Sequence, residues 1–496
     1  MEQKQDKFSS LGYVAAALGM CIGTGNVWRF PRICAANGGG AFIVAWTVAM
    51  LIYAVPLLST EMAIGKKTKL GTVGSFRDMG GKKFSWLGFY VAAVCFFLMS
   101  YYCVVQAYCF KYMVNSAVSF APNMTTAQTE ALWTAFTDSP AQVIICHAIC
   151  MGVGCFVVYK GISGGIEKFC KVMIPSLFAI LLGLAIYALT LDGASAGLQY
   201  LFTIDSSYLF NANTWIQAFV QAAWSTGAGW GFIIVYSNYV DKNEDIPNNC
   251  LLMGVGDNLG ALLAGILIIP AICALSPTAQ AASEALGSGN YGLTFIYVYQ
   301  LFTTIPGGRV ISFIFFFLLT MAALTSLFSM IEVGAKMMID LGFTRKKAVL
   351  LICGAGFLVG CFSAWSLNNI DNQDWVWGLG LLLSGALISI LAIKYGVEKL
   401  RTEEINSNGA LYSLPKWYYN TCMYAMPVLA IGMIIWWLVQ TKDWFPDSWL
   451  NPFVIQDNLA NTLFQWAVVF AVGLILNNYF NKKTEKGPFT KDADCE

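Results

Sequence analysis

The chain alternates between long apolar stretches and short polar connections. A helix that crosses the hydrocarbon core of a bilayer needs about 20 predominantly apolar residues. We predict one membrane-spanning helix in each of twelve such stretches: 11–36, 41–65, 84–117, 140–159, 168–190, 214–240, 249–275, 309–340, 346–366, 375–402, 417–440 and 459–480. The pattern therefore predicts an all-α membrane protein with twelve transmembrane helices.

Positive side chains occupy alternate connections between these stretches. The basic connections contain Lys66, Lys67, Lys69, Arg77, Lys82 and Lys83, then Lys160 and Lys168, then Arg345, Lys346 and Lys347. The connections 119–140 and 191–214 contain neither Lys nor Arg, whereas the tail after residue 480 contains several lysines. Because loops rich in Lys and Arg stay in the cytoplasm, we expect a multi-pass protein of the cell membrane with both termini cytoplasmic.

These spans predict five segments. They are a cytoplasmic N-terminal arm (1–10), helices 1 to 5 (11–190), helices 6 to 10 (214–402), helices 11 and 12 (417–480) and a cytoplasmic tail (481–496). The connection 276–308 is too polar to span the membrane and too long for a turn, so we predict a helical cap over an outer vestibule.

Composition narrows the class of protein. Hydrophobic residues make up 57% of the chain and charged residues 11%, where a soluble domain has about 25% charged residues. The net charge of +1 gives no reason to expect a nucleic-acid partner. The 15 cysteines lie mostly singly in apolar stretches, which is typical of small core residues. We find no paired nucleophile and base and no metal-ligand cluster, so we do not expect an enzyme; His147 is interpreted as a packing residue.

Two predicted spans contain closely spaced glycines. Gly19, Gly23 and Gly25 lie in the first span, and Gly227, Gly229 and Gly231 lie in the sixth. Each glycine costs about 1 kcal/mol against alanine inside a helix, so these runs favour local unwinding. Close packing of helices through small residues is the alternative. The two runs are five spans apart, an odd number, which gives the second half inverted topology. Such matched breaks are typical of a transporter site near the bilayer midplane.

The residues around the first break resemble a known family. The run from Gly19 to Pro31, followed by 37–42, resembles the first-helix signature of the neurotransmitter:sodium symporters. The resemblance continues at Pro56, Glu61, Tyr101, Tyr102, 221–239, 322–326 and 371–378. It implies a five-plus-five inverted repeat of the leucine-transporter type, with helices 1 and 6 unwound, and a sodium-coupled symporter that imports amino acids by alternating access.

The resemblance also implies two sodium sites. The first would use the carbonyl of Cys21 and the side chains of Asn26, Ser225 and Asp257. The second would use the carbonyls of Gly19, Ile22 and Ala322 and the hydroxyls of Thr325 and Ser326. Both sets offer oxygen ligands, which a hard cation prefers, although buried Ser and Thr often bond only to their own helix.

Asp257 is also a candidate from the residues alone. A carboxylate in the middle of an apolar span is costly unless it is paired, so such residues are usually functional. The alternative is a carboxyl group that bonds only to neighbouring helices. Chloride balances the charge near the first sodium in chloride-dependent relatives, and Asp257 would supply that charge here. We therefore expect chloride not to be required.

For the substrate, the resemblance implies contacts to its carboxylate and side chain. The backbone amides of Thr24 and Gly25 and the hydroxyl of Tyr102 would bind the carboxylate. The remaining positions of the substrate site are Leu98, Trp224, Gly227, Trp230, Ser326 and Met330. Gly23 stands where amine-selective members have an aspartate, so the substrate is expected to bring its own carboxylate.

Gly227 leaves space in this pocket, which favours large hydrophobic or aromatic amino acids. A carrier for an osmolyte, an amine or a GABA-like compound is one alternative, and a receptor or channel that does not transport is another. The sequence leaves the exact substrate and the oligomeric state open.

Charged residues suggest gates on either side of the site. Arg29 and Asp374 resemble the outer pair that closes over the substrate, and Asp340 resembles the acidic member of an inner pair. The usual N-terminal arginine partner of the inner pair is missing. Lys4 or Lys7 could replace it, although an ammonium group lacks the two-pronged geometry of a guanidinium.

Overall fold

The computed structural model describes residues 7–407, 410–484 and 487. Helices make up most of this part, and its one β-type contact is an isolated bridge between Gly39 and Ile204. The first helices are α1 (Ser10–Cys21), η1 (Gly25–Arg29), α2 (Phe30–Ala36), α3 (Gly40–Ala49), η2 (Met50–Ala54), α4 (Val55–Thr68), α5 (Thr72–Gly80), α6 (Ser85–Val118), α7 (Thr126–Thr137), α8 (Pro140–Tyr159), η3 (Ile162–Glu167) and α9 (Lys168–Leu189).

The remaining helices continue to the end of the described chain. They are α10 (Ala194–Phe202), α11 (Ser206–Leu209), α12 (Ala212–Thr226), α13 (Phe232–Tyr236), η4 (Ser237–Tyr239), α14 (Ile246–Leu275), α15 (Ala279–Leu286), α16 (Gly289–Tyr291), η5 (Gly292–Val298), α17 (Tyr299–Thr304), α18 (Gly308–Asp340), α19 (Arg345–Ala364), α20 (Leu367–Tyr395), α21 (Val397–Leu400), η6 (Arg401–Ile405), α22 (Lys416–Trp444) and α23 (Leu459–Lys483).

Ten helices of the described chain are long and apolar enough to cross a membrane. The bent pair Ser10–Cys21 and Gly25–Ala36, at 41°, makes eleven if it counts as one span. The predicted sixth span corresponds to α12 and α13, which a break separates into two short pieces. The membrane class is therefore clear, while the count of twelve stays a prediction.

The predicted tenth span, 375–402, is displaced from the helix that the structure contains. Helix α20 begins at Leu367, because the hydroxyl of Ser366 accepts a hydrogen bond from the amide of Asn369 and caps the helix. The first turns of α20 are polar, so a search for apolar stretches does not detect where this helix begins. The helix ends at Tyr395, where Gly396 takes a φ of 111° that favours glycine.

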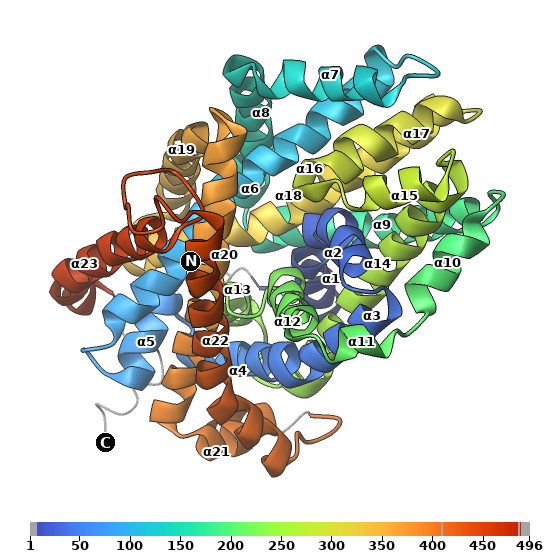
Figure 1. The fold of residues 1–496 in the computed structure, drawn as a ribbon. Coiled ribbons are helices and arrows are strands. Elements are labelled where there is room, and N and C mark those ends of the chain that lie inside the picture. Colours follow the sequence, from blue (N-terminus) through green and yellow to red (C-terminus); the bar gives the residue numbers. More distant parts are fainter. Residues whose placement is uncertain (1–6, 408–409, 485–486, 488–496) are drawn as a thin grey trace.

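The broken helices lie in the middle of the bundle (Figure 1). Helix α1 packs against α9, α14 and α18, and α13 packs against α4 and α18. The long helices α6 and α18 pack along each other, and α6 also contacts α8, α19, α20 and α23. Short helical breaks therefore sit between long continuous helices.

The connection between α14 and α18 folds into α15, α16, η5 and α17 (Figure 1), so the prediction that this connection is helical is confirmed. Its aromatic residues pack inward: Tyr291 stacks on Trp28, with ring centroids 5.9 Å apart. The Tyr291 hydroxyl also donates to Asp371 of α20, at 2.7 Å. This segment thus joins η1 to the beginning of α20.

Helices α4 and α13 approach each other at backbone distance. A Cβ atom placed on Gly65 of α4 would lie 2.0 Å from the carbonyl oxygen of Ile234 on α13. Such a distance excludes every side chain, so only glycine fits at this crossing.

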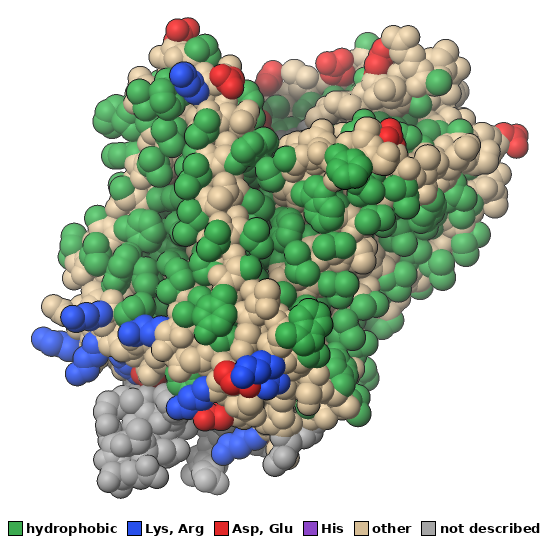
Figure 2. Space-filling model, turned by 60° about the horizontal axis from the view of Figure 1, so that its bottom comes forward, with side chains coloured by type: hydrophobic (Ala, Val, Ile, Leu, Met, Phe, Trp, Pro, Cys, Tyr) green, Lys and Arg blue, Asp and Glu red, His purple; other side chains and the backbone are tan. Residues whose placement is uncertain are grey.

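The surface separates into a hydrophobic band and charged ends. On the face drawn in Figure 2, most Lys and Arg side chains gather at one end of the band, and acidic side chains gather mainly at the other. This distribution is typical of a membrane protein with one basic side.

Candidate functional site

The first break lies between α1 and η1. Helix α1 ends at Cys21, and the amide of Gly23 donates to the Cys21 carbonyl at 2.9 Å and to the Asn26 side chain at 3.3 Å. The amide of Thr24 donates to the hydroxyl of Tyr102 at 3.2 Å. Two of the freed amides therefore bond polar groups of the break or of α6.

The second break lies between α12 and α13. Gly227, Gly229 and Gly231 have φ values of 72°, 92° and 76°, in the region that favours glycine. The amide of Gly229 donates to the Glu61 carboxylate at 2.6 Å, and its carbonyl accepts from the hydroxyl of Ser384. Side chains of α4 and α20 therefore satisfy the centre of this break.

Three side chains of the predicted first sodium site meet at one point. The Asn26 amide donates to one oxygen of Asp257 at 2.7 Å, and the Ser225 hydroxyl donates to the other at 2.8 Å. Asp257 is fully buried. The thiol of Cys21 donates to the Thr226 carbonyl at 3.2 Å, so the side chain of Cys21 contacts the second break. The side-chain oxygen atoms of Asn26, Ser225 and Asp257 lie close together, and oxygen is the ligand that a hard cation prefers.

Most groups of the predicted second sodium site also lie together. The Ser326 hydroxyl lies 3.1 Å from the Met20 carbonyl and 3.5 Å from the Gly19 carbonyl. The Thr325 hydroxyl donates to the Ala322 carbonyl at 2.8 Å, a bond within its own helix. The side chain of Ile22 faces α14, where a Cβ placed on Gly260 would lie 3.1 Å from it.

A small cavity of about 20 Å³ lies between the two breaks. Of the predicted substrate residues, Gly25, Tyr102, Trp224, Trp230, Ser326 and Met330 line it. The other predicted residues, Leu98, Thr24 and Gly227, do not line this cavity. Gly227 lies close to it, because a Cβ placed on Gly227 would be 3.1 Å from Met20 and from Phe232, which both line the cavity. Its volume has room for about one water molecule. An amino acid would fit only if the walls moved apart.

Arg29 and Asp374 both line a cavity of about 260 Å³ but have other partners in this structure. Arg29 donates to the Gln221 side chain at 2.5 Å, and Asp374 accepts from the Tyr101 hydroxyl at 2.9 Å. Within the described chain, Arg29 and Asp374 form no ion pair. The Gln221 amide also donates to the Gly25 carbonyl at 2.9 Å, so Gln221 connects the Arg29 guanidinium to the break.

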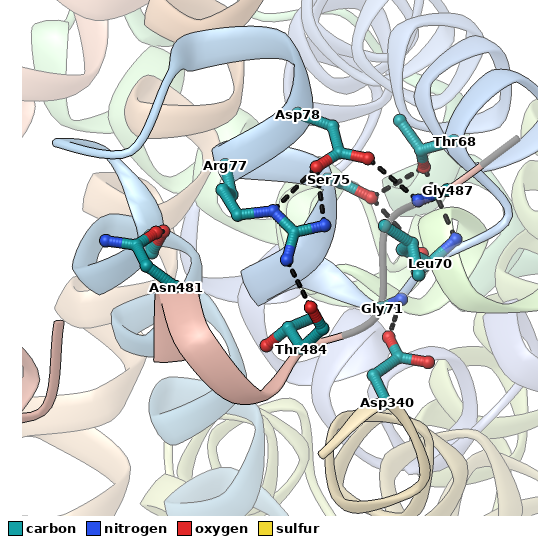
Figure 3. A network of polar contacts seen from close by, with 11 residues as sticks. Thr68, Leu70, Gly71, Ser75, Arg77, Asp78, Asp340, Asn481, Thr484 and Gly487 are labelled. Carbon is teal, nitrogen blue, oxygen red and sulfur yellow. Dashed lines mark hydrogen bonds and ion pairs between the residues drawn. The ribbon is translucent and has the colours of Figure 1, made fainter. Parts of the chain in front are cut away.

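Asp340 pairs with Lys336 of its own helix, at 2.7 Å, and accepts from the Gly71 amide at 2.6 Å (Figure 3). Lys7, one of the two candidate partners of Asp340, pairs in this structure with Asp241 at 3.2 Å. Lys4 lies outside the described residues. Beside Asp340, the end of the described chain binds α5: Arg77 donates to the Thr484 carbonyl, and Asp78 accepts from the Gly487 amide (Figure 3).

Sequence reasoning missed a buried ionic group between α18 and the beginning of α19. Arg345 pairs with Glu332 at 2.6 Å, and the Tyr239 hydroxyl donates to the same carboxylate at 2.8 Å. The signal was present, because Glu332 is an acidic residue inside an apolar span. His147, in contrast, is fully buried beside the Phe357 backbone, which agrees with a packing role.

With this geometry in view, comparison with known families is decisive. A model of the sodium:neurotransmitter symporter family matches residues 5–136 and 134–481. The chain belongs to this family. It is therefore a sodium-dependent transporter, and the family is one of transporters rather than enzymes.

Several relatives extend over most of the chain. A sodium-dependent transporter of Methanocaldococcus jannaschii is 28% identical over 447 residues, which cover 87% of this chain and 90% of the relative. Another, YhdH of Bacillus subtilis, is 29% identical and covers 84% of this chain and 94% of the relative. The human sodium- and chloride-dependent transporter XTRP3 is 30% identical over a shorter region, 52% of this chain and 48% of XTRP3.

A solved structure shows the fold. The crystal structure of MhsT in complex with L-phenylalanine has a TM-score of 0.77 and 27% identity with this chain. The match covers 87% of this chain and 99% of MhsT. The expected fold of the family is therefore confirmed.

Proposed function

We propose that this symporter imports amino acids together with two sodium ions by alternating access. The observation that carries the proposal is the buried Asp257 carboxylate, which Asn26 and Ser225 bind beside the two breaks. A buried carboxylate surrounded by neutral oxygens and amides is suited to a cation. The second sodium would bind among Gly19, Ile22, Ala322, Thr325 and Ser326.

The substrate carboxylate would bind at the break in the first span. The Tyr102 hydroxyl accepts a hydrogen bond from the Thr24 amide, and Tyr102 and Gly25 both line the small cavity between the breaks. Gly23 supplies no carboxylate at the position where amine-selective members have an aspartate, so the substrate would bring its own. Trp224, Trp230, Phe232 and Met330 also line the cavity, which favours a hydrophobic substrate.

Large hydrophobic or aromatic amino acids are the proposed substrates. Gly227 supports this proposal, because a Cβ at this position would lie 3.1 Å from Met20 and Phe232, which both line the cavity, so that any side chain there would crowd it. MhsT, which shares the fold, was crystallised with L-phenylalanine. A thermal-shift screen of the twenty amino acids in sodium and in potassium identifies the substrate, since a ligand that binds the folded state stabilises it.

The driving force is sufficient for concentrative uptake. A tenfold sodium gradient contributes about 1.4 kcal/mol per ion, and a potential of about 100 mV contributes about 2.3 kcal/mol per charge. Two ions thus supply roughly 7 kcal/mol, which permits about five decades of accumulation of a neutral substrate.

Uptake into proteoliposomes tests the proposal. We expect labelled phenylalanine or leucine to accumulate with an inward sodium gradient and not with an equal potassium gradient. Counterflow separates a carrier from a receptor or a channel, because only a carrier exchanges internal for external substrate. Sodium-dependent binding without counterflow would contradict transport.

We propose further that chloride is not required, because Asp257 supplies a fixed negative charge beside the first sodium. XTRP3 is named as chloride-dependent. Replacement of chloride by gluconate at saturating sodium should leave the uptake rate of this protein nearly unchanged. A substantial fall in that rate would overturn this proposal.

The outer gate is proposed to form from Arg29 and Asp374 during closure, with exchange of their present partners Gln221 and Tyr101. Asp374→Asn should then lower the transport rate more than the equilibrium affinity. Equal losses in both quantities would argue against a gate.

The two predicted five-helix units and the cytoplasmic position of both termini belong to the same proposal. The basic end of the surface supports the orientation (Figure 2). Labelling of single cysteines by an impermeant reagent in intact cells tests it.

A further inference from the structure

A groove of about 490 Å³ opens between α6, α18, α19 and α23. Four of the residues that line it are small, namely Ala92 and Ala93 on α6, Gly334 on α18 and Ala355 on α19. No charged side chain is among the residues that line it. At its rim, Leu351 is 50% exposed on a helix that is long and apolar enough to cross the membrane, so the groove opens toward the hydrocarbon.

Lysines lie at one end of this groove. Lys347 precedes the lining residue Leu351 by four positions on α19, which places both on the same helix face. Lys483 follows the lining residue Val472 by eleven positions, or three helical turns, on α23 and shares its face. Both lysines are exposed, and neither forms an ion pair within the described chain.

A further pair of lysines belongs to the same end. The Lys82 carbonyl accepts hydrogen bonds from the side chains of Asn477 and Asn481, so the connection before α6 lies against the last turns of α23. Lys82 and Lys83 are both exposed. The apolar groove therefore ends beside a group of positive charges.

We propose that the groove binds one acyl chain of an anionic phospholipid, whose phosphate lies between Lys347 and Lys483. An acyl chain fills a hollow that would otherwise lack contacting atoms on one side. The groove has the size of ordinary ligand sites, roughly 300 to 1,000 Å³. Basic residues next to a membrane surface attract anionic lipids by about 1 kcal/mol each.

A second copy of the chain fits this surface less well than a lipid does. A two-fold axis along the membrane normal places identical residues at the same depth on both sides of an interface. The Lys347 and Lys483 ammonium groups of both copies would then face each other along one seam, and like charges repel. A concave groove also does not complement its own copy.

The test measures lipid retention and thermal stability of the purified full-length protein in detergent. We expect dioleoylphosphatidylglycerol to raise the melting temperature and to stay bound in native mass spectrometry, at concentrations where dioleoylphosphatidylcholine does neither. The double variant Lys347→Gln, Lys483→Gln should bind the anionic lipid about thirtyfold more weakly, at about 1 kcal/mol per lysine. Equal retention of the two lipids by the parent protein would overturn the proposal.

Lys346 supplies the matched control for charge. Its ammonium lies 5.5 Å from the ring centroid of Tyr159 on α8, away from the groove. Lys346→Gln removes one positive charge from the same turn and should leave retention of the anionic lipid unchanged. If it weakens binding as much as Lys347→Gln does, the lipid responds only to net charge and this site is excluded.

A second pair of variants tests the groove itself. Ala355→Phe should fill the hollow and remove the bound lipid, whereas Leu350→Phe, at a neighbouring side chain that is 56% exposed, should not. Cross-linking of a Leu351→Cys variant tests whether a second copy of the chain occupies the groove instead of a lipid. A cross-linked dimer without retained lipid would assign the groove to a second copy and overturn the proposal. None of these outcomes depends on transport.

Discussion

The two helix breaks differ in the groups that satisfy them. At the first break, the freed amides of Gly23 and Thr24 bond the Asn26 side chain and the Tyr102 hydroxyl, which are themselves candidate ligand groups. At the second, Gly229 is bound through both its amide and its carbonyl by side chains of α4 and α20. The first break is therefore surrounded by groups that can exchange partners, and the second is fixed to its neighbours.

Each break also has one buried carboxylate, and the two carboxylates have different partners. Asp257 accepts from the side chains of Asn26 and Ser225, whereas Glu61 accepts from the backbone of Gly229. A carboxylate bonded to side chains can turn toward a cation at small cost. One that accepts from a backbone amide maintains the shape of the chain. We infer that Asp257 serves sodium and that Glu61 serves the fold.

Removal of each carboxylate charge gives the largest expected effect. Asp257→Asn keeps the shape but removes the charge, so we expect the sodium concentration for half-maximal stabilisation to rise about a hundredfold, about 2.8 kcal/mol. Glu61→Gln, the matched change at the other break, should lower the melting temperature more than it alters the sodium response. Similar sodium curves for the parent and Asp257→Asn would break the comparison.

The glycines of the two breaks should differ in their tolerance of a methyl group. Gly229 has a φ of 92°, and its Cβ would lie 3.1 Å from the Cα of Gly385. Gly229→Ala should therefore destabilise the protein by about 2 kcal/mol. Gly25→Ala is the control, because its Cβ would meet nothing closer than 3.7 Å. Thermal unfolding in detergent measures both, and equal losses would contradict a more rigid second break.

Substrate size tests whether the second break shapes the pocket. Gly227→Ser places a side chain against Met20 and Phe232, and overpacking costs about 1 to 3 kcal/mol. We expect the affinity ratio of tryptophan to alanine to fall about tenfold. Backbone strain at this residue affects both substrates alike and cancels in the ratio. If the ratio does not change, Gly227 does not set the size limit.

A smaller effect should appear in the pH dependence of stability at the end of the second broken span. The Lys69 ammonium donates to the carbonyls of Ser237 and Val240, and burial lowers its pKa to about 8. Between about pH 8 and its unfolded pKa near 10.4, the unfolded chain binds more protons, so stability rises with pH.

Lys69→Gln should remove that part of the rise. The difference between the melting curves of the two proteins over this range isolates Lys69 from other titrating groups. Parallel curves would show that Lys69 keeps an ordinary pKa.

The sequence predicts the spanning helices well, because hydropathy is a local property. It also brings Asn26, Ser225 and Asp257 to one site through the resemblance to the family, although Asn26 and Asp257 are 231 positions apart. The start of α20 was missed because its polar side chains have partners outside the helix: Asn372 bonds Asn461, and Gln373 bonds Gln465. Only the packed structure shows that these residues can lie inside a bundle.

Partner choice among charged residues was the least predictable part of the site. Arg29 and Asp374 face the same cavity, yet Gln221 and Tyr101 are their partners in this structure. Lys336 pairs with Asp340 one helical turn away, a local solution that a search for distant partners overlooked. Such choices depend on distances of a few ångström, which neither hydropathy nor residue spacing encodes.

The contact between Gly65 and Ile234 has a mechanical consequence. Backbone meets backbone there, with no layer of side chains along which one helix could slide past the other. In any rocking motion α4 and α13 would therefore move together as one rigid unit. The part of the broken helix that follows Gly231 would then turn together with α4.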